Sequence, residues 1–129
     1  MGKKIFIIED DATLLSSLQA KFSVEGFSVL VNNGAGDINE ILKLLKTSNP
    51  DLIILDLILP KIDGFELLGT IKSTEVISNI PTFVFSNLSD DDSKEKCHRL
   101  GAEQYFVKSE FNLDQFIGKI KKIVSNKIK

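Results

Sequence analysis

Acidic side chains follow two short apolar runs of this chain. Glu9, Asp10 and Asp11 follow the first run, and Asp56 follows the other. Carboxylates that share one crevice repel each other, by about 1 kcal/mol per pair at ~4 Å in water and about 4 kcal/mol at an effective dielectric of about 20. A divalent cation reverses the sign of this interaction, and a small open cluster of oxygen ligands suits Mg²⁺. If the fold brings these residues together, the sequence therefore predicts a magnesium site.

Two further residues, Lys108 and Ser86, could complete a site for phosphoryl transfer. A Mg²⁺ ion held by protein carboxylates typically also binds a phosphate oxygen, and an ammonium and a hydroxyl could bind the other phosphoryl oxygens. Asp56 would be the nucleophile, because a carboxylate can accept a phosphoryl group as an acyl phosphate. The protein would then act mainly by positioning an in-line attack and neutralising charge.

Five short apolar runs alternate with five amphipathic stretches, which is typical of an α/β fold with a parallel sheet covered on both faces. Right-handed crossovers make such a sheet doubly wound, and we expect the flavodoxin-like strand order 2-1-3-4-5. Ligands bind such sheets at the carboxyl ends of the strands, where all the residues named above fall. The expected strands are 5–8, 27–31, 52–55, 82–85 and 105–107, and the expected helices are 12–25, 38–45, 65–71, 90–101 and a stretch from about 113.

Length and composition favour one globular domain of 129 residues, with 43% hydrophobic and 26% charged residues. A net charge of −2 argues against direct nucleic-acid binding, which needs a basic surface. The one cysteine excludes a disulfide framework, and no apolar stretch reaches the ~18 residues of a membrane span. We therefore expect a cytoplasmic protein that inserts in no membrane. Because the chain ends with its last helix, we also expect no output domain.

In their order and spacing, these segments resemble the receiver domain of bacterial two-component response regulators, in particular stand-alone, chemotaxis-regulator-like ones. The resemblance covers nearly the whole chain, and the segments that carry it are specific as a set. They are 5–11, 50–60 together with 63–65, 81–86 and 101–108.

The resemblance implies a phosphorylatable switch rather than an enzyme, with Asp56 as phosphoacceptor and Lys108 beside it. It implies that Mg²⁺ binds Glu9, Asp10, Asp56 and the backbone carbonyl of Ile58. It also implies Ser86 as the switch hydroxyl and Tyr105 as the switch aromatic. The phosphodonor would be a sensor histidine kinase, a phosphotransfer protein or a small molecule. A downstream protein would bind the face formed by the fourth helix, fifth strand and fifth helix, and the chain would be a monomer or a weak phosphorylation-linked dimer.

The chain departs from the family pattern at several positions near the expected site. Ser109 stands where proline, often after a cis bond, is usual, and a non-proline cis bond costs ~2.5–4 kcal/mol. Asn87 stands where a small alanine is common. Ile58 and Leu88 are bulky and apolar at the two positions that flank the site. We hypothesise that these two side chains shield the acyl phosphate from water and prolong the phosphorylated state.

Three other functions compete with the phosphorylatable switch. An aspartate-nucleophile phosphatase would show the motif Asp-x-Asp, in which the second acid is the general acid. Here position 58, two residues after Asp56, is Ile. A flavin or nucleotide binder needs a phosphate loop after the first strand, where Glu9 and its acidic neighbours would repel phosphate; the chain also lacks a P-loop and a complete dinucleotide fingerprint. A pseudo-receiver that binds a partner without phosphorylation stays open because of Asn87 and Ser109.

Several conspicuous residues also have ordinary structural explanations. Asp11 would cap the first helix, and the acids at 90–92 would stabilise the first turn of the fourth helix by about 0.3–1 kcal/mol each. Cys97 would pack within that helix, and His98 would be an ordinary side chain on it.

Overall fold

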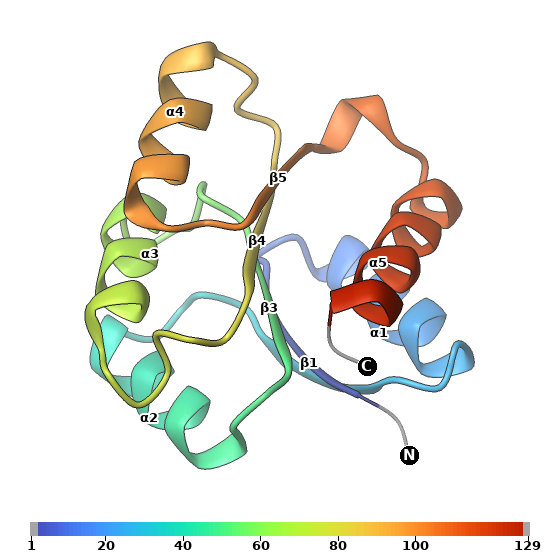
Figure 1. The fold of residues 1–129 in the computed structure, drawn as a ribbon, viewed down its shortest axis with the longest axis horizontal. Coiled ribbons are helices and arrows are strands. Elements are labelled where there is room, and N and C mark those ends of the chain that lie inside the picture. Colours follow the sequence, from blue (N-terminus) through green and yellow to red (C-terminus); the bar gives the residue numbers. More distant parts are fainter. Residues whose placement is uncertain (1–2, 128–129) are drawn as a thin grey trace.

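The computed structural model describes residues 3–127, and Figure 1 shows their arrangement. Strands and helices alternate along this range, as the sequence predicts. The strands are β1 (Lys4–Ile8), β2 (Ser28–Asn32), β3 (Leu52–Leu55), β4 (Thr82–Ser86) and β5 (Gln104–Val107). The helices are α1 (Ala12–Val24), α2 (Ile38–Ser48), α3 (Gly64–Ser73), α4 (Asp91–Leu100), the 3₁₀ turn η1 (Lys108–Glu110) and α5 (Leu113–Lys127).

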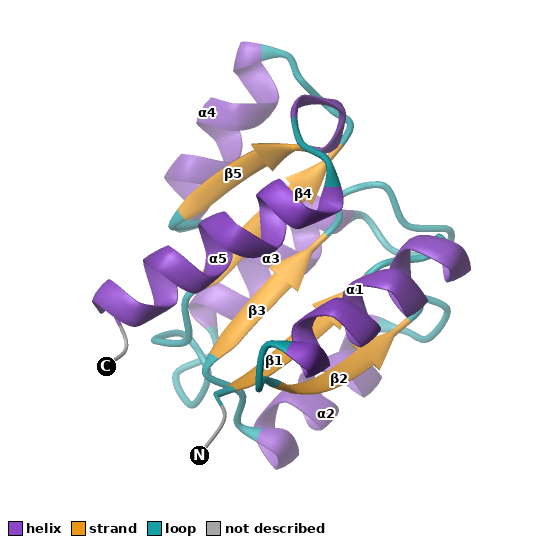
Figure 2. Ribbon diagram, turned by 90° about the vertical axis from the view of Figure 1, so that its right-hand side faces the viewer, coloured by secondary structure: helices purple, strands orange, loops and turns teal. Residues whose placement is uncertain are grey.

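All five strands are parallel and form one sheet in the order β2-β1-β3-β4-β5. This confirms the doubly wound, flavodoxin-like fold. Helices α2, α3 and α4 cover one face of the sheet, and α1 and α5 cover the other (Figures 1 and 2). Among the described residues, no helix is long and apolar enough to cross a membrane.

The central strand β3 shows why the sheet is buried on both faces. Its four residues are all buried, and the side chains alternate between the faces. Ile53 and Leu55 belong to the apolar layer under α2, α3 and α4, whereas Leu52 and Ile54 belong to the layer under α1 and α5. Because neither face of β3 is exposed to solvent, a polar side chain is first accommodated at the carboxyl end of the strand.

Aspartates begin four of the helices and set where each loop ends. The side chains of Asp11, Asp37, Asp63 and Asp90 accept backbone N–H groups of the first turns of α1, α2, α3 and α4. The predicted cap at Asp11 is therefore confirmed. Asp90 also caps its helix, so only the two acids that follow it lie in the first turn of α4.

Packing at the back of the sheet holds α5, and with it the chain that follows β5. The Phe116 ring of α5 stacks on the Phe85 ring of β4, with centroids 3.9 Å apart. It also meets the rings of Phe22 and Phe106 edge-on. Aromatic pairs of this kind add about 0.5–1.5 kcal/mol beyond the area that they bury. The position of β5 and of the residue after it is thus fixed from the α5 side.

Candidate functional site

The register of the sheet brings the first and third strands' acids together. Ile8 lies beside Leu55, so Glu9 and Asp56 each come one residue later on neighbouring strands. The Asp56 N–H donates to the Ile8 carbonyl at 3.0 Å, which continues the ladder to this point. Ligand oxygens of Glu9, Asp10 and Asp56 all lie within 4.8 Å of one another. The predicted cluster of carboxylates at this edge of the sheet is confirmed.

Asp56 is buried within this cluster and is only 5% exposed. Its Oδ1 accepts the backbone N–H of Ile58 at 3.1 Å, and its Oδ2 accepts Lys108 Nζ at 2.7 Å. These two donors hold the carboxylate in one orientation. The backbone of Ile58 therefore lies next to the Asp56 side chain. That the Ile58 carbonyl binds the metal ion stays a prediction.

Lys108 connects the two buried acids from the end of β5. Its Nζ is 2.7 Å from Glu9 Oε1 and 2.7 Å from Asp56 Oδ2, and its side chain is 15% exposed. Burial lowers the pKa of Lys108, but its hydrogen bonds to Asp56 and Glu9 outweigh burial and raise that pKa overall. Lys108 is therefore a fixed positive charge at the strand ends.

Glu9 is the most buried acid of the cluster, at 2% exposure. Burial raises the pKa of Glu9, although the hydrogen bond from Lys108 and the N–H of Asp11 act in the opposite direction. The Asp11 N–H donates to Glu9 Oε2 at 3.0 Å. Asp10, in contrast, is exposed and lies at the open side of the cluster.

The charges of this cluster do not balance within its own contacts. Three carboxylates share the site, and Lys108 supplies one positive charge to two of them. The excess is negative, and every candidate ligand is an oxygen that could bind a hard divalent cation. The donor set therefore fits a metal ion such as Mg²⁺, with Asp10 on the side open to solvent.

A tight contact beside Asp56 depends on glycine. A Cβ added to Gly64 would lie 2.4 Å from the Leu57 Cα and carbonyl oxygen. Backbone atoms cannot move aside as a flexible side chain could, so this position needs glycine. The first turn of α3 thus packs directly on the residue after Asp56, and it fixes the loop that leaves β3.

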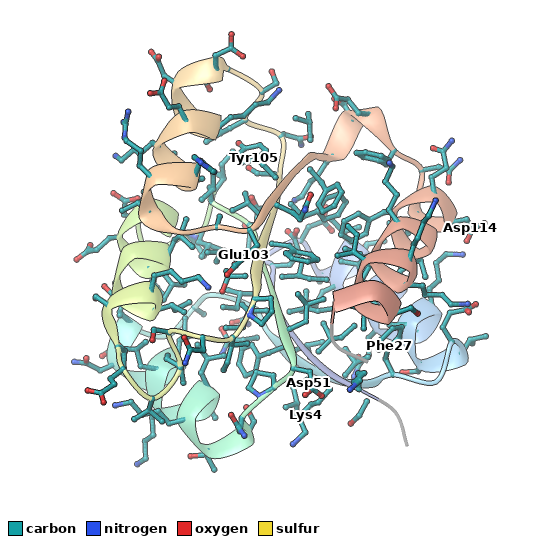
Figure 3. All side chains as sticks on the ribbon, viewed as in Figure 1. Lys4, Phe27, Asp51, Glu103, Tyr105 and Asp114 are labelled. Carbon is teal, nitrogen blue, oxygen red and sulfur yellow. The ribbon has the colours of Figure 1, made fainter. Side chains whose placement is uncertain are left out.

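Ser86 and Tyr105 lie on neighbouring strands and are connected through Leu88. Ser86 is fully buried, and its Oγ accepts the Leu88 N–H at 3.4 Å. The Tyr105 hydroxyl donates to the Leu88 carbonyl at 2.6 Å. Tyr105 lies on the side of the sheet that α4 covers (Figure 3). Burial raises the pKa of Tyr105 to about 12.

The remaining sequence expectations concern the peptide bond after Lys108 and two residues of α4. No peptide bond among residues 3–127 is cis, so the Lys108–Ser109 bond is trans. This bond lies within η1, a 3₁₀ turn that the apolar pattern did not indicate. Cys97 is fully buried in the layer under α4, which confirms its packing role, and His98 is exposed.

The pairing of Lys108 with both acids and the Tyr105 bond to Leu88 were also not predicted. No sequence pattern signals either contact, because each depends on side chains from elements far apart in the chain.

The chain matches known proteins along most of its length. The family model described as "Response regulator receiver domain" matches residues 5–121. The "Probable transcriptional regulator ycf27" of Porphyridium aerugineum is 33% identical over 106 residues, which cover 82% of this chain and 42% of that protein. The chain spans about half or less of the length of the curated relatives it matches.

Solved structures agree with this match. The receiver domain of Francisella response regulator 1452 is 26% identical, with a TM-score of 0.82, and the match covers 97% of this chain and 98% of that one. The phosphorylated cyanobacterial phytochrome response regulator RcpA is 32% identical, with a TM-score of 0.79 and coverage of 96% and 92%. The Mn²⁺-bound form of response regulator Rcp1 is 26% identical, with a TM-score of 0.76 and coverage of 95% and 92%.

Proposed function

Because this chain belongs to the response regulator receiver domain family, we propose that Asp56 is the residue that accepts the phosphoryl group. Receiver domains are phosphoacceptor switches, signalling modules rather than catalytic enzymes, and their phosphodonors are histidine kinases. The observation that carries the proposal is the buried Asp56 carboxylate, oriented by Ile58 N–H and Lys108 and grouped with Glu9 and Asp10.

The covalent step would be a displacement at phosphorus. An Asp56 carboxylate oxygen attacks the phosphorus atom, an acyl phosphate bond forms, and the bond from phosphorus to the donor breaks. The donor atom keeps the electron pair of the broken bond. If the donor is a phosphohistidine, its ring nitrogen then takes up a proton. If the donor is acetyl phosphate, acetate is released. Lys108 would bind a phosphoryl oxygen through its fixed ammonium group, as an electrostatic contribution to the transition state. Water later cleaves the acyl phosphate to the carboxylate and inorganic phosphate.

Glu9, Asp10 and Asp56 would hold Mg²⁺, with the Ile58 carbonyl as a further ligand. Bound there, the ion supplies positive charge to the phosphoryl oxygens. The Mn²⁺-bound relative and the unbalanced charge of the cluster support this assignment. Replacing Asp10 by asparagine leaves the buried pair intact and should weaken Mg²⁺ binding, measured by calorimetry.

Ser86 and Tyr105 would carry the signal away from Asp56. The Ser86 hydroxyl would turn toward a phosphoryl oxygen. The backbone of Leu88, whose N–H contacts Ser86 and whose carbonyl contacts Tyr105, would move with it. The expected change is a new position of the loop before α4, and of the face made by α4, β5 and α5. We propose that face as the binding site for a downstream protein. A cytoplasmic location and a phosphorylation-linked dimer stay predictions.

Intact-mass measurement after incubation with Mg²⁺ and acetyl phosphate tests the proposal directly. We expect one phosphate adduct on the wild-type protein and none on Asp56→Asn. Asp51→Asn is the matched control, because Asp51 precedes the same strand at its opposite end and contacts Lys4 instead. An adduct that persists in Asp56→Asn would reassign the phosphoacceptor. No adduct and no response to beryllofluoride would favour the pseudo-receiver.

A further inference from the structure

The strand β2 forms one edge of the sheet and carries no charged residue or proline. It pairs with β1 on one side, and no strand lies beyond it within residues 3–127 (Figure 2). Its five residues read Ser-Val-Leu-Val-Asn. Proteins usually protect an edge strand from other chains with lysine, proline, a bulge or a covering segment. The residues of β2 itself include neither a lysine nor a proline.

The backbone groups of β2 point alternately toward β1 and away from it. The Ser28 N–H donates to the Lys3 carbonyl, and the Asn32 carbonyl accepts the Glu9 N–H. In a parallel ladder every second residue faces the neighbouring strand. Ser28, Leu30 and Asn32 therefore face β1. The N–H and C=O groups of the two valines face the open edge.

Apolar side chains are exposed along the same edge. Leu30 is 36% exposed and Val31 is 39% exposed. Leu30 pairs with Phe6, which belongs to the layer under α2. Leu44, which is 47% exposed, belongs to α2, one of the helices that cover this face of the sheet. The edge thus offers both hydrogen-bonding groups and apolar surface.

We propose that β2 pairs with β2 of a second copy of this chain, antiparallel and centred on Leu30. The strand has the same polarity read in either direction: polar, Val, Leu, Val, polar. In the centred register, Val29 of one copy faces Val31 of the other. These are the residues whose N–H and C=O groups face outward, so each valine pair exchanges two hydrogen bonds.

The two-fold symmetry of this register is the reason for choosing a second copy as partner. A two-fold interface uses the same patch on both subunits, so the patch must be complementary to itself. Here valine meets valine, leucine meets leucine, and serine meets asparagine, and no like charges of β2 oppose each other. In a register shifted by one residue, the outward-facing N–H and C=O groups of the valines would lie opposite residues whose own backbone groups face β1. Because one strand from each copy makes most of the contact, the dimer is weak and depends on concentration.

Disulfide cross-linking tests the register. In an antiparallel pair the two residues at the centre of this register form a non-hydrogen-bonded pair, with Cα atoms ~4.5 Å apart, which a disulfide can span. Leu30→Cys should therefore form a covalent dimer under mild oxidation. Val76→Cys is the control, because Val76 is 72% exposed and lies just before β4, which β1 and β3 separate from β2. The native Cys97 is fully buried, with a pKa raised to about 11 by burial, so it adds little background.

Sedimentation equilibrium over a range of concentrations tests the same dimer without cross-links. Val31→Lys should raise the dimer dissociation constant at least tenfold, whereas Val76→Lys, the same change at another exposed valine, should leave it unchanged. Circular dichroism checks that both variants fold. If Val31→Lys does not fold, the cross-linking of Leu30→Cys still tests the pairing. A wild-type chain that stays monomeric at every concentration would overturn the pairing. The edge would then be free for a strand of another protein. A dimer that neither variant alters, or equal cross-linking at positions 30 and 76, would also overturn the pairing.

Discussion

Replacing Lys108 by methionine removes a cation that contacts two buried carboxylates. Lys108 Nζ lies 2.7 Å from Glu9 and 2.7 Å from Asp56, whose side chains are 2% and 5% exposed. Removing one partner of a buried ion pair costs about 3–5 kcal/mol, because the remaining charge is buried without compensation. For a domain of this size, that loss lowers Tm by on the order of 10–20 °C.

Thermal unfolding followed by circular dichroism in EDTA measures this loss. Lys121→Met is the matched control, because the Lys121–Glu25 pair is as short, at 2.6 Å, but its side chains are 49% and 36% exposed. Exposed pairs contribute only about 0–1 kcal/mol, so the control should lower Tm by a few degrees at most. Millimolar Mg²⁺ should reduce the loss in Lys108→Met, since a divalent cation at the acids replaces part of the missing charge. Equal losses in the two variants would refute the argument from burial.

Three further outcomes follow from the geometry. The Tyr105 hydroxyl should ionise near pH 12 rather than 10 in an absorbance titration, which reports this residue alone because the chain has one tyrosine; its contribution to stability is complete below pH 10 and is lost as the pH rises to about 12. Ile58→Asn combined with Leu88→Glu should speed loss of phosphate from the phosphorylated protein, since water reaches the acyl phosphate more easily; decay no faster than in the wild type would defeat the shielding hypothesis. Asp90→Ala should lower the free energy of unfolding by about 0.5–2 kcal/mol in urea titrations, because the N-cap of α4 is lost; no change would mean that Ser93 N–H finds another acceptor.

The fold could be predicted from the sequence because its apolar runs are buried on both faces. A run such as 52–55, apolar throughout, fits a central parallel strand, and the helices between such runs indicate parallel crossovers. The order of the strands was expected from the flavodoxin-like fold, and the sheet has that order. The acidic cluster could be predicted for the same reason. Once β1 and β3 are neighbours, the residues that follow them must meet, and the 4.8 Å grouping of Glu9, Asp10 and Asp56 confirms it.

The sequence could not indicate how the polar groups pair within the site. Lys108 could have met the acids singly or only a ligand, and its contact with both Glu9 and Asp56 depends on the length of β5 and on the turn η1 that follows it. The bond from Tyr105 to the Leu88 carbonyl depends on the path of a loop, which has no periodic pattern. Asp90 illustrates the smaller errors, because a helix start is uncertain by a residue when three aspartates stand in a row.

The hydroxyl of Tyr105 has one further consequence, for how this protein can be observed. The chain contains no tryptophan, so emission excited at wavelengths that its phenylalanines do not absorb arises from this single ring. Tyrosine emission depends on the hydrogen bond of its hydroxyl, and here that bond ends on the backbone of the loop before α4. A loop movement that breaks this hydrogen bond changes the emitted light, and therefore the kinetics of that movement can be followed in the unlabelled chain.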